Sequence, residues 1–147
     1  MIVDIHTHIF PDKIRKHREA FFEGEDAFCL LYGSPKAKMV GPEALVEAMD
    51  EQGVDRSVTF GFPWNDMNTM RMHNDHVLEA AARFPDRLLP FCCVPIGHPE
   101  STSEVQRCLR AGAKGVGELA CYKSRMDNQA LDALTGIMKC ALEFDVP

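Results

Sequence analysis

The sequence lacks a long hydrophobic run, a run of basic residues, a glycine- and serine-rich linker and a repeat of constant period. No apolar stretch approaches the roughly 20 residues of a membrane-spanning helix, which argues against membrane insertion. The net charge of −6 argues against a protein that binds duplex nucleic acid. Asp4 and His6 interrupt the apolar run that a secretory signal requires, so we expect a cytoplasmic protein without nucleic-acid or membrane partners.

The six cysteines form no CxxC pair and no even framework of the kind that disulfide scaffolds show. Cys92 and Cys93 are adjacent in an apolar stretch and cannot both face one partner. We therefore predict reduced thiols that serve as small core residues. With 147 residues, of which 46% are hydrophobic, the chain is long enough for about one globular domain.

Helix and strand patterns alternate along most of the chain. Several segments have apolar residues at helical spacing. They alternate with apolar runs in which polar and apolar residues alternate too little for a half-exposed strand. The predicted helices cover 42–52, 68–84, 99–112 and 131–142, and the predicted strands cover 2–8, 54–62, 88–95 and 113–120. Residues 10–41 contain mixed residues with several glycines and prolines, and we predict a long active-site loop there.

Four βα units with apolar strands indicate a parallel sheet covered by helices, that is, an α/β protein of the TIM (β/α)8 barrel type. A complete barrel needs about 250 residues, so residues 1–147 hold only about the first four units. The closing "EFDVP" is typical of the approach to a fifth strand. We expect the amino-terminal half of a longer protein, and the alternative is a half-barrel that pairs with another chain, such as a second copy.

Two histidines and a glutamate are the candidate site residues. His6 and His8 lie on one face of the first strand because strand side chains alternate, and Asp4 shares that face. Glu118 comes at the end of the fourth strand, and the carboxyl ends of parallel barrel strands share one edge. Two imidazoles and a carboxylate are common ligands of divalent ions, so His6, His8 and Glu118 predict a metal site, with zinc first and manganese as the alternative.

"DIHTHIFP" near the amino terminus and "GELACY" at the fourth strand resemble the amidohydrolase superfamily, in particular its amidohydrolase-2 branch of metal-dependent hydrolases and decarboxylases. The resemblance covers this whole chain but only the first half of such a family member. It implies that His6, His8 and Glu118 bind metal, while the remaining ligands and the proton-handling aspartate belong to strands five to eight. The catalytic residue therefore stays unknown.

The activity that the resemblance implies is metal-assisted hydrolysis of a small organic substrate, in which the ion activates water. Decarboxylation within the same superfamily and an inactive, truncated half-barrel are the alternatives. Trp64 and His98 follow the second and third strands on the same side as the histidines, and we predict that they contact substrate. Simple packing for Trp64 and a turn position for His98 are their alternatives. Cys121 and Tyr122 are candidates for the pocket lining only.

Three further polar residues have less specific patterns. Asp4 either orients a metal ligand or pairs with another charge near the floor of the barrel. His73 and His76 are spaced by three residues on a predicted helix, and we expect them on a solvated or half-buried face.

Overall fold

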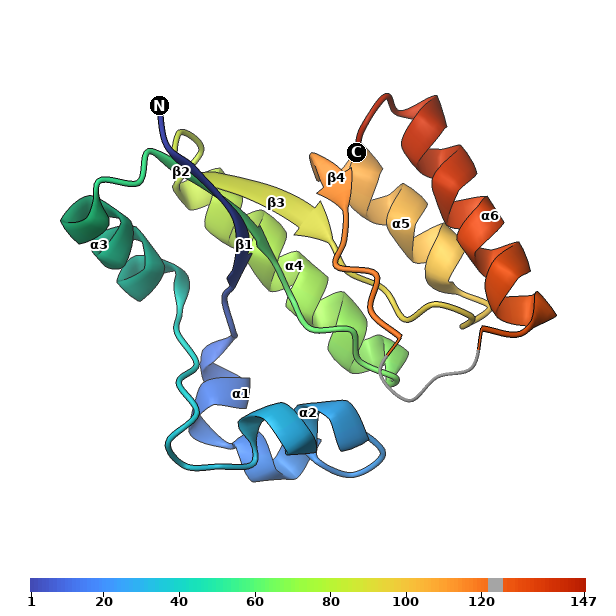
Figure 1. The fold of residues 1–147 in the computed structure, drawn as a ribbon, viewed down its shortest axis with the longest axis horizontal. Helices are drawn as coiled ribbons and strands as arrows, with labels where there is room; N and C mark the ends of the chain where they lie inside the picture. The colour runs from blue at the N-terminus through green and yellow to red at the C-terminus, as the bar shows by residue number, and fades with distance from the viewer. Residues whose placement is uncertain (122–125) are drawn as a thin grey trace.

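The computed structural model describes residues 1–121 and 126–147. Four strands form one parallel sheet in sequence order, with β1 and β4 at its two edges (Figure 1). The strands are β1 (Val3–His8), β2 (Arg56–Phe60), β3 (Leu88–Cys92) and β4 (Gly115–Val116). The predicted α/β class with a parallel sheet is confirmed, and β4 is shorter than predicted, so that Glu118 lies just beyond the strand.

Helices cover one side of the sheet. The longest, α4, packs against β2 and β3, and α5 packs against β3 and α6 (Figure 1). The helices are α1 (Asp12–Lys16), α2 (Asp26–Tyr32), α3 (Pro42–Gln52), α4 (Met67–Arg83), α5 (Ser101–Arg110) and α6 (Asn128–Glu143), with a short 3-10 helix, η1 (Arg18–Phe21). Among the described residues, no helix combines the length and the apolar character that crossing a membrane requires.

Local signals in the sequence explain where these helices begin and end. Pro42 occupies the first turn of α3, and Gly53 ends that helix with a positive φ of 68°. The carboxylates of Asp66 and Asp127 accept hydrogen bonds from backbone N–H groups in the first turns of α4 and α6. Beyond α6, the Val116 N–H donates to the Pro147 carbonyl at 2.9 Å, so the last residue lies beside β4.

The segment 10–41 is not the irregular loop that the sequence predicts. It contains α1, η1 and α2, and its side chains Phe10, Ile14 and Phe28 are fully buried in one core cluster with Trp64. These helices have only four to seven residues, which is too short for a helical periodicity to stand out. The buried Glu25 carboxylate accepts backbone N–H groups of Asn65 and Asp66, which ties this segment to the turn after β2. Its role at an active site stays a prediction.

All six cysteines are free, as predicted. Cys92, Cys93, Cys108 and Cys140 are buried. Cys29 and Cys121 are exposed, which corrects the prediction that every thiol lies in the core.

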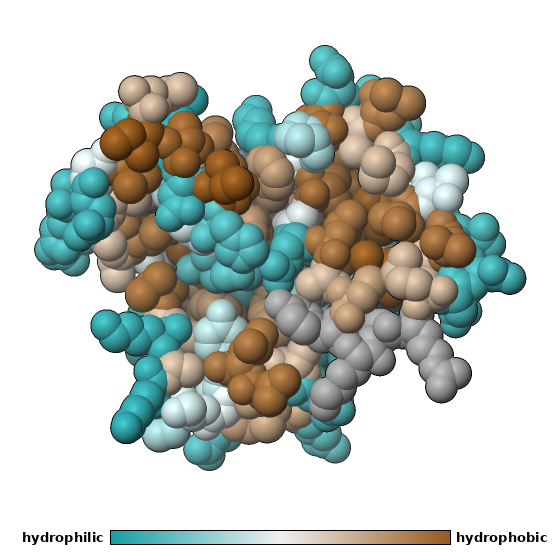
Figure 2. Space-filling model, in the orientation of Figure 1, coloured by the Kyte–Doolittle hydropathy of each residue, from teal (hydrophilic) through white to brown (hydrophobic). Residues whose placement is uncertain are grey.

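Apolar surface remains exposed at both edges of the sheet. Ile5 of β1 and Ile2 just before that strand are exposed, and Figure 2 shows hydrophobic surface in the part of the view that β4 and α6 occupy in Figure 1. On α6, Leu131, Met138 and Leu142 are exposed and line one shallow apolar groove.

The buried Glu104 carboxylate of α5 and its partner Arg107 link α5 to α4 behind β3, through Asn74 and Asp75 of α4. The Glu104 carboxylate is only 1% exposed and accepts two hydrogen bonds of 2.8 Å from the Arg107 guanidinium. The Asn74 amide of α4 donates to the same carboxylate at 2.9 Å. Burial alone would raise the pKa of Glu104, but these donors outweigh burial and lower the pKa below its usual value.

Replacing Arg107 with alanine should therefore destabilise the fold. The change removes two hydrogen bonds to the buried Glu104 carboxylate, which keeps the Asn74 amide and the more distant Arg71 guanidinium, and we expect a loss of about 1 to 3 kcal/mol of unfolding free energy. Urea denaturation followed by circular dichroism measures the loss. Arg110→Ala on the same helix is the control, because Arg110 is exposed and we expect almost no change. Equal stability of the two variants would contradict a structural role for the pair.

Candidate metal centre

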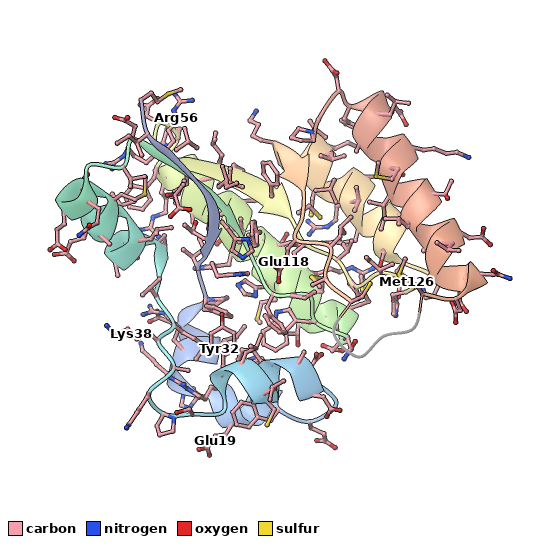
Figure 3. The ribbon with its side chains drawn as sticks, viewed as in Figure 1. Glu19, Tyr32, Lys38, Arg56, Glu118 and Met126 are labelled. Carbon is pink, nitrogen blue, oxygen red and sulfur yellow. The ribbon has the colours of Figure 1, made fainter. Side chains whose placement is uncertain are left out.

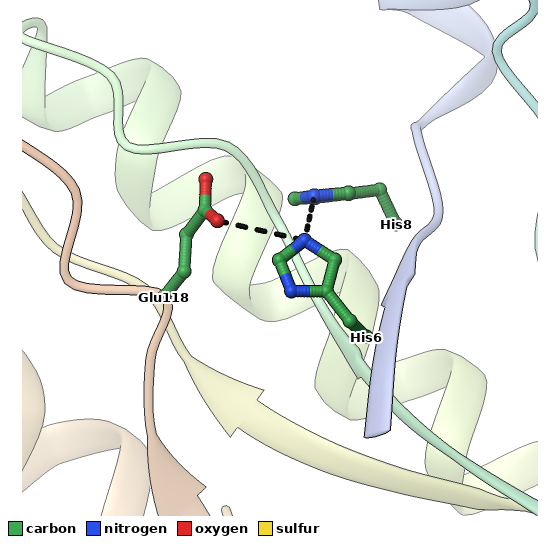
Figure 4. A group of neighbouring side chains, drawn as sticks. All are labelled: His6, His8 and Glu118. Atoms are coloured by element: carbon green, nitrogen blue, oxygen red, sulfur yellow. Dashed lines mark hydrogen bonds and ion pairs between the residues drawn. The ribbon is translucent and has the colours of Figure 1, made fainter. Parts of the chain in front are cut away.

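His6, His8 and Glu118 come together at the carboxyl ends of β1 and β4, as predicted (Figure 4; Figure 3 labels Glu118 within the whole chain). The two Nε2 atoms of the histidines lie 3.2 Å apart, and the Nε2 atom of His6 lies 3.5 Å from Oε2 of Glu118. One nitrogen or oxygen atom from each side chain lies within 4.8 Å of the other two. Residues 110 positions apart in the sequence thus face one point in space.

The His8 ring is fixed by the backbone beyond β2. Its Nδ1 atom lies 2.8 Å from the Gly61 carbonyl, which can only accept, so Nδ1 carries the proton and donates it. The Nε2 atom then has a free lone pair directed toward His6. Burial lowers the pKa of His8, which favours the neutral ring that a metal ligand must be.

The His6 ring is more exposed and rests on an aromatic side chain. Phe60, which pairs with His8 across the sheet, meets the edges of both imidazoles at centroid distances of 4.9 and 4.7 Å. Phe60 is itself buried. This packing restricts how far either ring can turn.

A bulge in β1 changes the simple alternation that the sequence predicts. Asp4 pairs with Ser57 but Thr7 pairs with Thr59, so β1 contains one more residue than β2 between these pairs. The Asp4 carboxylate accepts the backbone N–H of His6 at 3.0 Å. Asp4 therefore holds the backbone of His6 at the bulge, which agrees with the first of its two suggested roles, the orientation of a predicted ligand, although the contact is with the His6 backbone and not with its ring.

Glu118 is held through its backbone. The Cys93 thiol lies 3.2 Å from the Glu118 carbonyl and donates to it. Burial raises the pKa of Cys93, so the thiol keeps the proton that this bond needs. Asn74 in turn holds Cys93, because its amide accepts the Cys93 N–H at 3.1 Å and donates to the Cys93 carbonyl at 3.0 Å.

The three side chains fit a divalent ion. Two atoms bound to one ion at about 2.1 Å lie about 3.0 to 3.4 Å apart in tetrahedral or octahedral coordination. The 3.2 and 3.5 Å separations at His6 are close to that range. The side chain of Glu118 is 20% exposed and that of His6 is 57% exposed, which leaves an approach for an ion and for water.

Trp64 and His98 form hydrogen bonds with other parts of the chain. Trp64 is fully buried, and its indole N–H donates to Nδ1 of His73 at 2.9 Å. His98 accepts the Glu100 N–H at 3.2 Å in the turn before α5. These are packing and turn positions, so substrate contact by either residue stays a prediction without support from the geometry. Tyr122 lies outside the described residues.

The pair of histidines on α4 differs from the prediction. His76 is half-buried, as expected, but His73 is completely buried and forms hydrogen bonds through both ring nitrogens. The helical spacing places His73 on the apolar face with Met70 and Val77, and this pattern was the available signal of its burial.

Comparison with known proteins supports the same fold. Neither a family model nor a curated protein matches the sequence. Solved structures do match, among them 5-carboxyvanillate decarboxylase from Novosphingobium aromaticivorans, complexed with manganese and 4-hydroxy-3-methoxy-5-nitrobenzoic acid. That match has a TM-score of 0.76 and 20% identity, over 100% of this chain and 49% of the decarboxylase chain. The predicted resemblance to amidohydrolase-superfamily structures is confirmed at the level of the fold.

Two further structures agree. A Staphylococcus aureus protein assigned as an amidohydrolase matches with a TM-score of 0.66 and 21% identity, over 99% of this chain and 45% of that chain. 4-Oxalomesaconate hydratase from Rhodopseudomonas palustris matches with a TM-score of 0.63 and 17% identity, over 100% and 51% of the two chains. This chain thus spans about half the length of the structures that it resembles.

The burial of Cys93 behind Glu118 predicts a difference in thiol reactivity. In the folded chain an aromatic disulfide reagent at pH 8 should modify the exposed Cys29 and Cys121 quickly. The other thiols should react only after unfolding in urea, and mass spectrometry of the peptides identifies them. Rapid modification of Cys93 in the folded chain would contradict its position beneath Glu118.

Proposed function

We propose that the chain carries half of the active site of a divalent-metal-dependent enzyme of the amidohydrolase superfamily. The observation that carries this proposal is the convergence of His6, His8 and Glu118 at the carboxyl edge of a parallel sheet. We propose further that the sheet belongs to a (β/α)8 barrel of a cytoplasmic enzyme, with hydrolysis of a small organic substrate as its reaction.

Each of the three side chains has a part in this proposal. His8 can bind the ion through Nε2, because the Gly61 carbonyl accepts the proton of its Nδ1 atom. His6 supplies the second imidazole, and both rings pack on Phe60. Glu118 supplies a negative charge that offsets the charge of an ion. His6, His8 and Glu118 would hold the divalent ion, which would supply Lewis-acid chemistry for the activation of water and substrate. Zinc and manganese both suit two imidazoles and a carboxylate.

Decarboxylation is the second candidate reaction. It is supported by the solved decarboxylase, which has a higher TM-score than the other structures described above and contains manganese. The two reactions differ in their products. Release of carbon dioxide from hydroxylated benzoates by the manganese-loaded chain would favour decarboxylation, whereas release of acid from lactones or amides would favour hydrolysis.

The proposal predicts that removing any one of the three ligands removes the metal. His6→Ala, His8→Ala and Glu118→Gln should each weaken binding of Mn²⁺ or Zn²⁺ by more than about 100-fold, because loss of a direct ligand should exceed the effect of an outer partner. Elemental analysis after dialysis against a weak chelator, together with calorimetric titration, measures this loss. Helix content by circular dichroism should stay the same.

Two matched substitutions test whether the effect is specific. His17→Ala and Glu51→Gln change exposed residues of the same types, and both should bind metal like the unmodified chain. If the three ligand variants retain the same metal content as these controls, the assignment of the centre is wrong. A chain that binds metal without turning over any substrate would support the alternative of a half-barrel that is inactive alone.

A further inference from the structure

His73 of α4 lies beneath the metal centre, outside the group of predicted ligands. The residue is completely buried, and each ring nitrogen has a hydrogen-bond partner. Nε2 lies 2.6 Å from the Ile9 carbonyl, and Nδ1 lies 2.9 Å from the indole nitrogen of Trp64. The backbone N–H of Phe62 also points to Nδ1, at 3.4 Å.

These partners fix a single form of the ring. A carbonyl can only accept, so Nε2 of His73 carries a proton and donates it to Ile9. An indole N–H and a backbone N–H can only donate, so Nδ1 carries a lone pair and accepts from Trp64 and Phe62. The ring is therefore neutral, and a side chain there must both donate and accept.

The two groups of partners come from different strands. Ile9 directly follows His8 at the end of β1, whereas Phe62 and Trp64 follow β2. Gly61 packs on the face of the ring so closely that a Cβ atom there would lie 2.9 Å from Cγ of His73. Gly61 is also the residue whose carbonyl holds Nδ1 of His8. His73 thus contacts both the residue after His8 and the residue that orients the His8 ring.

We propose that His73 is a positioning residue for His8, because it fixes the carboxyl ends of β1 and β2 relative to each other. Nε2 of the ring binds Ile9 and Nδ1 binds the turn after β2, so the ring sets the distance between these two segments. Gly61 has no side chain, which allows the turn to approach the His73 ring closely. The role of His8 as a ligand rests on the proposed function, but the effect of His73 on the His8 ring does not.

The test measures the tautomer of His8 without metal. The 147-residue chain is labelled with ¹⁵N-histidine, and long-range ¹H–¹⁵N correlation spectra are recorded at pH 8 with a chelator. We expect His8 in the single Nδ1–H form. His73→Phe keeps the ring volume but removes both hydrogen bonds, and it should leave His8 in a mixture of the two tautomers. His73→Gln, which both donates and accepts, should restore the single form.

A control separates positioning from general loss of stability. Ile137→Ala creates a cavity in the core cluster beside α5 and α6, away from His73, and His8 should keep its single tautomer. A single Nδ1–H form in both His73→Phe and Ile137→Ala would overturn the proposal, as would a mixture in the unmodified chain. If His73→Phe does not fold, Gly61→Ala is used in its place. The added Cβ atom would push the turn after β2 away from the His73 ring, so His8 should again show a mixture of tautomers. An unchanged single tautomer of His8 in Gly61→Ala overturns the proposal.

A metal titration of the same proteins separates this inference from the proposed function. If both hold, His73→Phe should weaken Mn²⁺ binding by about 10- to 100-fold, as loss of an outer partner does, and His73→Gln by less. An unmodified chain that binds no Mn²⁺ but shows the tautomer change would refute the metal site and retain the positioning role. Equal Mn²⁺ affinity and equal tautomers in the unmodified chain and His73→Phe would refute the positioning role alone.

Discussion

Parallel pairing of the four strands is the constraint on which the rest of the structure depends. Because β1 to β4 all run in the same direction, their carboxyl ends lie at the same end of the sheet. Groups far apart in the sequence meet at that end. His6 and His8 end the first strand and Glu118 follows the last. If neighbouring strands ran antiparallel, the carboxyl ends of β1 and β4 would lie at opposite ends of the sheet, and the histidines would be far from the glutamate.

Periodic patterns in the longer segments of the sequence predicted most of this architecture. The four βα units, the parallel sheet and the grouping of His6, His8 with Glu118 all followed from apolar periodicity and from strand direction. Features decided by tertiary contacts were missed. The helices of segment 10–41 are too short to show a period, and they are stabilised by the burial of Phe10 and Phe28 against Trp64.

Single polar residues were also hard to place, because their positions depend on tertiary contacts. The sequence treats Asp4 as one position in an alternating strand, but a bulge directs its carboxylate to the His6 backbone. His73 was predicted on a solvated or half-buried face because its helical pair with His76 has no carboxylate partner. The ring is instead buried, and its two nitrogens are satisfied by Trp64 and Ile9, which lie outside α4. Buried polar groups need such partners, and partners of this kind are brought together only by the fold.

Two neighbouring residues of α4 support the two sides of the centre. His73 contacts the ends of β1 and β2, and Asn74 holds the Cys93 backbone whose thiol holds Glu118. Because both supports belong to one turn of one helix, the histidine side and the glutamate side share a rigid base. In the proposed metal site, the three side chains would therefore lose little conformational freedom on binding an ion, which is the energetic advantage of preorganisation.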